Sequence, residues 1–109
     1  MGPLAAGAVV LVPFPFSDLS QAKLRPALAL ANAGQGDWIL CQITSNPYAD
    51  LQALRLVDAD FTSGSLSRES FLRPGKLFTA HRSLIVRAVG QIKAGKLLEA
   101  KRSLMKLLR

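Results

Sequence analysis

The sequence predicts a mainly β protein that ends in one α-helix. Short β-branched and apolar runs recur along residues 7–92, and turn signals rich in Gly and Pro separate them. From residue 95 onward the hydrophobic period changes to that of a helix. Half of the 109 residues are hydrophobic, enough for a core in one domain. We therefore expect a small barrel or strongly bent sheet over residues 1–109, with residues 1–6 flexible.

The first two predicted strands flank a polar connection. Residues 7–12 are apolar and β-branched, as in a buried strand, and two prolines end the run. Residues 17–24 are polar and rich in turn formers. Pro26 then opens a second strand over residues 26–31, because a proline has no N–H for a ladder and suits a first strand position.

The second and third strands are predicted to form a β-hairpin. Residues 26–31 and 38–43 are apolar, and the turn at residues 32–37 contains two glycines. Antiparallel pairing brings the start of one strand and the end of the other to the same end of the hairpin. Arg25 and Thr44 are therefore expected to lie close together.

Shorter elements follow the hairpin. Residues 54–57 are predicted to form a short strand, and residues 58–67 a polar excursion. A second short strand over residues 70–73 should stop at Pro74-Gly75, a strong turn signal. Residues 84–92 read as the last clear strand.

The C-terminal segment, residues 95–109, is predicted to be an amphipathic helix. Its leucines, alanine and methionine fall on one half of a helical wheel, with Lys101 among them, and most charged residues fall on the other half. The apolar half is expected to pack on the sheet or on a second subunit. A basic amphipathic helix can also bind a membrane surface, but covering its own sheet is the better interpretation.

The net charge of +7 is unevenly distributed. Residues 1–66 carry three Lys or Arg against five Asp, whereas residues 67–109 carry eleven Lys or Arg against two Glu. A basic half is typical of proteins that bind a polyanion, and nucleic acid is the first candidate. An acidic partner protein is the alternative.

Cysteine and histidine usage excludes several kinds of site. Cys41 is the single cysteine, so no intrachain disulfide can form, and His81 is the single histidine. One of each gives no recognisable metal-ligand spacing. The sequence shows no signal peptide and no apolar stretch of about 20 residues. We expect a cytoplasmic protein without a membrane span.

Several runs resemble, in order and spacing, the MazF/PemK family of toxins from bacterial toxin–antitoxin pairs. The similarity extends from Gly7 to the final helix, nearly the whole chain. The runs that carry it are Gly7 with its β-branched strand, Pro13-Phe14-Pro15-Phe16, Arg25-Pro26-Ala27-Leu28, residues 39–45 (ILCQITS), residues 70–79 (SFLRPGKLFT) and residues 84–92 (LIVRAVGQI).

The resemblance implies an SH3-like barrel of antiparallel strands with a C-terminal helix, assembled as a homodimer. Family members are metal-independent endoribonucleases that need no cofactor and cut single-stranded RNA. An antitoxin holds them in check with a flexible acidic segment that lies across the RNA groove. The family's catalytic arginine, in the Arg-Pro step, falls on Arg25, and its catalytic threonine or serine falls on Thr44.

These residue types suit cleavage by the RNA's own 2′-hydroxyl, which leaves a 2′,3′-cyclic phosphate and a 5′-hydroxyl. A guanidinium can hold two oxygens of the phosphorane in a bidentate fork. Thr44 can hydrogen-bond the phosphate or orient the 2′-hydroxyl, but it is a poor general base by itself. A plain surface arginine at a strand start is the alternative interpretation of Arg25.

Other polar or aromatic residues are candidates for RNA contacts. Tyr48 could stack a base, whereas Trp38 is better explained as a core residue. His81 titrates near neutrality and could be an acid, a base or a phosphate contact. The remaining predicted RNA contacts are Lys23, Ser45, Asn46, Arg73 and Lys76.

The sequence departs from the family pattern at two positions, and the missing acid at Gly75 favours a second interpretation, whereas Arg25 with Thr44 disfavours it. Ala8 stands where many members have an acidic residue, and Gly75 follows Arg73-Pro74 where an Arg-Cys-Asp-like stretch is common. The alternative function is a non-catalytic SH3-like module that binds RNA or an acidic protein. A basic structural protein of a ribonucleoprotein is a third interpretation, and it would not require paired Arg25 and Thr44.

Overall fold

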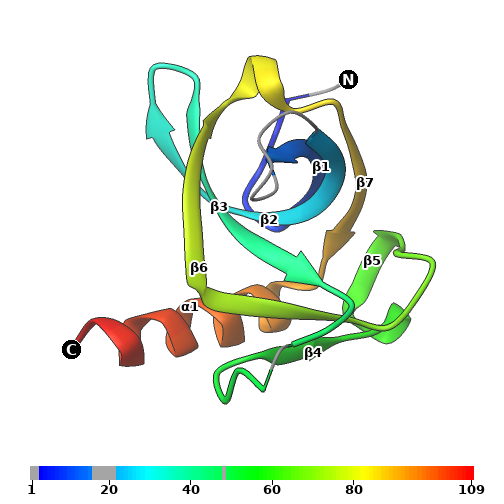
Figure 1. Ribbon diagram of the computed structural model, residues 1–109, viewed down its shortest axis with the longest axis vertical. Helices are drawn as coiled ribbons and strands as arrows, with labels where there is room; N and C mark the ends of the chain where they lie inside the picture. The colour runs from blue at the N-terminus through cyan, green and yellow to red at the C-terminus, as the bar shows by residue number, and fades with distance from the viewer. Residues whose placement is uncertain (1–2, 16–21, 48) are drawn as a thin grey trace.

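The structure, a computed structural model, describes residues 3–15, 22–47 and 49–109. These residues form a strongly curled antiparallel sheet of seven strands, in the order β4-β6-β3-β2-β1-β7-β5, with one helix beneath it (Figure 1). The expected mainly β fold with a C-terminal helix is confirmed. The elements are β1 (Ala8–Pro15), β2 (Ala22–Gly34), β3 (Asp37–Thr44), β4 (Leu54–Leu56), β5 (Phe61–Gly64), β6 (Ser70–His81), β7 (Arg87–Ile92) and α1 (Ala94–Leu108).

The predicted hairpin of β2 and β3 is confirmed, and a tight turn joins the two strands. Gly34, Gln35 and Gly36 have φ values of 92°, 56° and 83°, so three successive residues adopt left-handed conformations. Glycine reaches this region without steric cost, which explains the two glycines of the turn. From this turn the strands run antiparallel as far as the pair Ala27 and Gln42, with register shifts between Asn32 and Gly34 and between Ala29 and Ala31.

The second strand starts earlier than predicted, at Ala22 instead of Pro26. Pro26 is therefore an interior residue, paired with Leu11 of β1. A proline is tolerated there because the ladder between β2 and β3 ends at Ala27, so this part of β2 is paired on one side only. Residues 17–21 of the predicted polar loop lie outside the described residues.

The prediction that a strand stops at Pro74-Gly75 was wrong, because β6 runs through to His81. The register against β3 shifts here: Cys41 faces Leu77, whereas Gln42 faces Arg73. Residues 74–76 have no partner in β3 and form a bulge, which bends the strand without ending it. Figure 1 shows this bend directly above α1.

The predicted polar excursion contains a strand that the sequence did not reveal. β5 pairs with β7 at one edge of the sheet, and Asp58–Asp60 form a 3₁₀ turn before it. Its sequence, Phe-Thr-Ser-Gly, has one large apolar side chain and gives little periodicity. The last strand is shorter than predicted, because Arg82–Leu84 form a second 3₁₀ turn.

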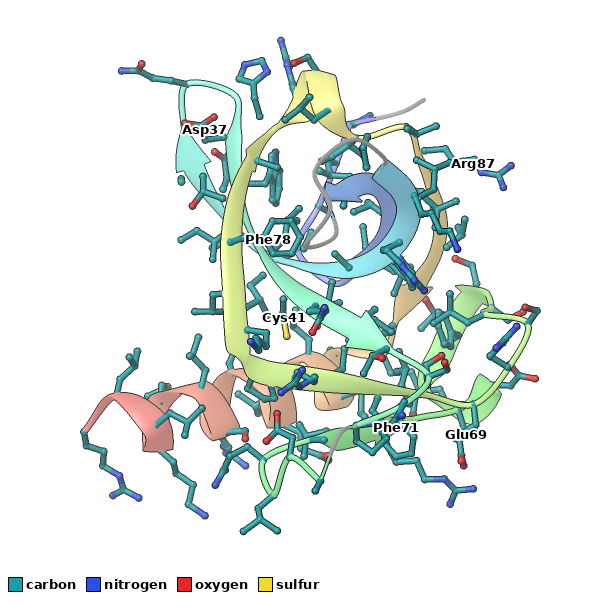
Figure 2. The ribbon with its side chains drawn as sticks, viewed as in Figure 1. Asp37, Cys41, Glu69, Phe71, Phe78 and Arg87 are labelled. Atoms are coloured by element: carbon teal, nitrogen blue, oxygen red, sulfur yellow. The ribbon has the colours of Figure 1, made fainter. Side chains whose placement is uncertain are left out.

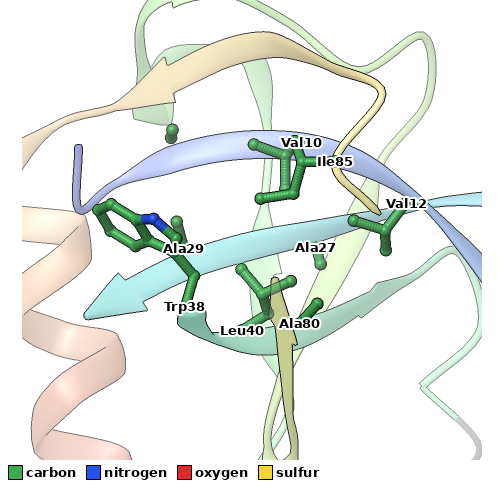
Figure 3. Close-up of a cluster of buried hydrophobic side chains, with 9 residues drawn as sticks. Val10, Val12, Ala27, Ala29, Trp38, Leu40, Ala80 and Ile85 are labelled. Carbon is green, nitrogen blue, oxygen red and sulfur yellow. The ribbon is translucent and has the colours of Figure 1, made fainter. Parts of the chain in front are cut away.

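Two apolar clusters pack against opposite faces of the curled sheet. The first lies inside the curl and includes Trp38, so the prediction of Trp38 as a core residue is confirmed (Figure 3). The second lies on the α1 side of the sheet. Val9 and Val10 alternate between the two clusters, as successive strand residues should. The second cluster comprises Val9, Leu28, Leu30, Cys41, Ile43, Leu56, Leu72, Ile92 and Ala100.

The helix α1 covers the sheet with only part of its apolar face. Ala100 is buried, and Leu97 and Leu104 pack on the second cluster, as predicted. Other members of the same face stay exposed, among them Met105 and Leu108. In the described part of the chain, no helix is both long enough and apolar enough to span a membrane.

Candidate active site

A cleft of about 350 Å³ opens where β2 and β3 separate. Pairing between the two strands ends at Ala27 and Gln42, although β3 continues to Thr44 and β2 extends back to Ala22. The unpaired ends therefore leave room between them. The lining residues are Leu11, Leu24, Arg25, Pro26, Ile43, Thr44, Ser45, Leu66, Ser67, Arg68 and Ser70.

Arg25 and Thr44 both line this cleft, as expected from the predicted hairpin. The register that pairs Leu28 with Cys41 and Ala27 with Gln42 would, two residues further on, place Arg25 opposite Thr44. Arg25 is exposed and Thr44 is half-buried. A guanidinium and a hydroxyl thus face one space that is open to a polymer.

The hydroxyl of Thr44 is held in place by the following turn. Thr44 Oγ1 donates a hydrogen bond to the Asn46 carbonyl at 3.0 Å and accepts one from the Asn46 N–H at 3.1 Å. A hydroxyl has one proton and two lone pairs. With its proton engaged, Thr44 retains the capacity to accept one more hydrogen bond from a ligand.

The cleft is positively charged. Two of its lining residues are arginines, four carry hydroxyls, and the described lining includes no Asp or Glu. Such a surface attracts an anion and offers several hydrogen-bond donors to it. Elsewhere, too, the described residues contain no group of three or more His, Cys, Asp or Glu arranged to hold a metal ion.

The predicted RNA contacts are divided between the cleft and other places. Ser45 lines the cleft, and Asn46 shapes it by holding Thr44. Lys23 is exposed on β2, two residues before Arg25, and is not among the lining residues. Tyr48 lies outside the described residues.

Arg73 and Lys76 lie outside the cleft. Arg73 Nε is 2.9 Å from Asp50 Oδ2, with both side chains only 16% exposed, and Arg73 Nη1 donates to Gln42 Oε1 at 3.4 Å. This pair fastens the segment after β3 to β6. Arg73 and Lys76 both lower the pKa of Asp50 below its usual value, Arg73 through a hydrogen bond and its charge, and Lys76 through its charge.

Gly75 also lies away from the cleft. A Cβ at this position would be 3.6 Å from Leu107 Cδ1 of α1, so Gly75 sits at the β6 bend against the helix. Its lack of a carboxylate therefore removes no group from the cleft itself.

Cys41 contacts the backbone of β6 next to its bend. Its Sγ donates to the Arg73 carbonyl at 3.1 Å, and Figure 2 shows the side chain between the sheet and α1. Burial raises the pKa of the thiol to about 12. Since the thiolate is the reactive form, we expect the native protein to resist a thiol reagent at pH 8 and to react fully once unfolded in urea. Rapid labelling of the folded protein would contradict this placement.

His81 is far from Thr44. It faces Asp37 across the sheet, whereas Thr44 faces Phe71, and Figure 2 shows Asp37 and Phe71 at opposite ends of the molecule. The His81 Nδ1 accepts a hydrogen bond from the Ser83 N–H at 3.1 Å and so caps a 3₁₀ turn. His81 therefore has a structural partner and no access to the cleft.

Sequence reasoning missed the other wall of the cleft, formed by residues 66–68 and Ser70. The signal available was a polar Ser- and Arg-containing stretch directly before a strand. Nothing in that pattern indicated that it would fold back beside the end of β3. Pairing of Thr44 with Phe71 brings it there.

Comparison with known proteins identifies relatives of this chain. Residues 5–108 match the model of a family described as the PemK-like, MazF-like toxin of type II toxin–antitoxin systems. No curated protein sequence matches the chain.

Solved structures share the fold at low sequence identity. A chain in the MazE–MazF structure (Form-II) from Deinococcus radiodurans has a TM-score of 0.73 and 24% identity, over 94% of this chain and 93% of that one. An endoribonuclease in complex with its cognate antitoxin from Mycobacterial species has a TM-score of 0.72 and 12% identity, over 99% and 95%. The Mycobacterium tuberculosis toxin MazF-mt6 has a TM-score of 0.71 and 16% identity, over 93% and 95%.

Proposed function

Because the chain belongs to the family of PemK-like and MazF-like toxins of type II toxin–antitoxin systems, we propose that it is an endoribonuclease toxin that cuts single-stranded RNA. The observation that supports this most directly is the meeting of Arg25 and Thr44 in one positively charged cleft. The similar mycobacterial structure is named as an endoribonuclease bound to its antitoxin, which supports the same activity here.

In the proposed reaction the 2′-oxygen of the RNA attacks the adjacent phosphorus, and the bond from phosphorus to the 5′-oxygen breaks. The 2′-hydroxyl loses its proton to solvent, and the departing 5′-oxygen gains one from solvent. The products are a 2′,3′-cyclic phosphate and a 5′-hydroxyl. Arg25 stabilises the negative charge that develops on the phosphorane, through two parallel N–H donors.

Thr44 orients the attacking group in this proposal. Its proton already bonds the Asn46 carbonyl, so the hydroxyl acts toward RNA as an acceptor. It can accept the hydrogen bond of the 2′-hydroxyl and hold that group in line for attack. No described lining residue supplies a carboxylate or an imidazole, so Thr44 is a positioning group and not a base.

The proposed partners follow from family membership and charge. A cognate antitoxin with an acidic segment would complement the cleft and compete with RNA for it. We also propose a cytoplasmic homodimer that works without a metal or a cofactor. The exposed apolar residues of α1 offer one surface on which a second subunit could pack.

The test is an RNA cleavage assay with purified protein in EDTA, followed by mapping of the ends. We expect cuts at defined positions that leave 2′,3′-cyclic phosphate and 5′-hydroxyl ends. Arg25→Ala protein, purified in parallel, controls for contaminating ribonuclease. Salt-dependent RNA binding without any cleavage would instead support the non-catalytic binding module, which the lack of a carboxylate among the described lining residues favours.

A further inference from the structure

The cleft contains a second arginine that the proposed reaction does not use. Arg68 lies in the turn between β5 and β6 and lines the cleft together with Arg25. It also borders a neighbouring hollow with Arg55 and Glu69. Its side chain is exposed, so a polymer in the cleft can reach it.

In the described part of the chain, Arg68 differs from Arg55 and Arg73 because its guanidinium has no protein partner. Arg55 forms an ion pair with Glu69, and Arg73 forms one with Asp50. Within residues 3–15, 22–47 and 49–109, the Arg68 guanidinium makes no hydrogen bond or ion pair. The acidic residue next to it, Glu69, is already paired. The full hydrogen-bonding capacity of the Arg68 guanidinium is therefore available to a ligand.

The sheet order places the two cleft arginines on opposite sides of Thr44. Arg25 belongs to β2, Thr44 to β3, and Arg68 comes two residues before β6, which is the strand on the other side of β3. The two guanidinium groups therefore enter the cleft from different walls. An RNA strand that crosses the strand ends carries a phosphate at each nucleotide step.

We infer that Arg68 forms a second phosphate-binding subsite, which holds an RNA phosphate flanking the one that is cleaved. The Ser67 hydroxyl lines the same wall and can add a donor to this phosphate, whereas the Ser70 hydroxyl already donates its proton to the Arg68 carbonyl at 3.1 Å. This inference rests on the proposed function, because it assumes an RNA strand whose reacting phosphate lies at Arg25. Arg68 then contributes to substrate binding and alignment, while Arg25 acts on the reacting phosphate.

The first test measures binding to an RNA made around a mapped cut, with a 2′-deoxy nucleotide at the cleavage position so that it cannot react. We expect Arg68→Ala to weaken binding about tenfold, as for a lost charged hydrogen bond. The slope of log affinity against log salt should fall by about 0.7, the value for one phosphate contact on a single strand. The matched control is Arg87→Ala, which removes an exposed arginine of β7 that does not line the cleft and should leave the slope unchanged.

The second test asks which phosphate Arg68 binds. A neutral methylphosphonate replaces each flanking phosphate in turn, and affinity is measured with wild type and Arg68→Ala. At one position the wild type should lose about as much affinity as the arginine substitution causes, while the variant loses little more. With cleavable RNA, Arg68→Ala should raise KM and leave kcat within about twofold.

The outcomes separate this inference from the proposed function. If wild-type protein binds and cuts RNA but Arg68→Ala matches it in affinity and salt slope, the subsite is wrong and the ribonuclease proposal stands. A large loss of kcat with unchanged KM would also overturn the subsite, because it would place Arg68 at the reacting phosphate. If the wild type neither binds nor cuts RNA, the proposed function fails, and the subsite fails with it. Circular dichroism of the variants checks that they fold.

Discussion

Replacing Arg25 with alanine is expected to lower the rate of RNA cleavage at least about 100-fold and to abolish growth inhibition. One preorganised donor at a developing negative charge contributes about 3–4 kcal/mol in measured cases, and Arg25 is the arginine placed beside Thr44. The side chain is exposed, so its loss should leave the fold and the unfolding midpoint unchanged. Single-turnover cleavage of a mapped RNA measures the effect.

Two further variants sharpen this experiment. Arg25→Lys keeps the charge but loses the planar fork, so we expect it to recover only a small part of the activity. Arg87→Ala removes an exposed arginine of β7 that does not line the cleft, and it should cleave at the wild-type rate. An Arg25→Ala protein that cuts as fast as the wild type would show that this residue is not catalytic.

Substitution of Arg73 should affect stability instead of cleavage. Arg73→Met leaves Asp50 with one partner fewer in a site where both side chains are only 16% exposed. We expect it to lower the free energy of unfolding by about 2–3 kcal/mol, as for the loss of a charge-assisted and largely buried pair. Urea unfolding measures the loss, and the double variant Arg73→Met/Asp50→Asn should lose less than the sum of the single changes.

Cleavage at a temperature where Arg73→Met remains folded should stay within about threefold of the wild type, since Arg73 does not line the cleft. A fall of 100-fold in the folded variant, with stability unchanged, would instead assign Arg73 to the RNA site.

The same pair also predicts a pH dependence of stability. Arg73 lowers the pKa of Asp50 below its ordinary value of 3.8 in the folded protein. The pair therefore stabilises the fold fully above that value, and its contribution disappears as the pH falls from 3.8 through the lowered pKa. The urea midpoint of the wild type should drop over this range more steeply than that of Asp50→Asn. Parallel curves for the two proteins would mean that Asp50 titrates normally.

Features that depend on local pattern could be predicted from the sequence. The hairpin turn with two glycines, the apolar strands on either side of it and the period change after residue 95 each have a local cause. The meeting of Arg25 and Thr44 followed from the hairpin alone, because antiparallel pairing puts the start of one strand and the end of the other at the same end of the hairpin.

Features that depend on packing between distant segments could not be predicted. Pro74-Gly75 reads locally as a stop, but pairing with β3 on both sides of the bulge carries β6 through it. The sequence does not indicate that Arg73 pairs with Asp50, because the segment after β3 brings the two residues together only in the folded chain. Arg68 could not be predicted as a cleft residue from the sequence. It reaches the cleft because its turn folds back beside the end of β3, more than 20 residues away in the chain.

The left-handed turn at Gly34, Gln35 and Gly36 helps to set which residues of β2 and β3 lie opposite each other. Surface turns usually accept insertions, but a one-residue slip in an antiparallel pair exchanges the faces of every side chain beyond it. The hairpin already contains register shifts between Ala29 and Ala31 and between Asn32 and Gly34. A single added residue that no further bulge takes up would bring Ile43 or Ser45 opposite Arg25 in place of Thr44. A length change at this turn is therefore expected to alter the cleft, although no residue of the turn lines it.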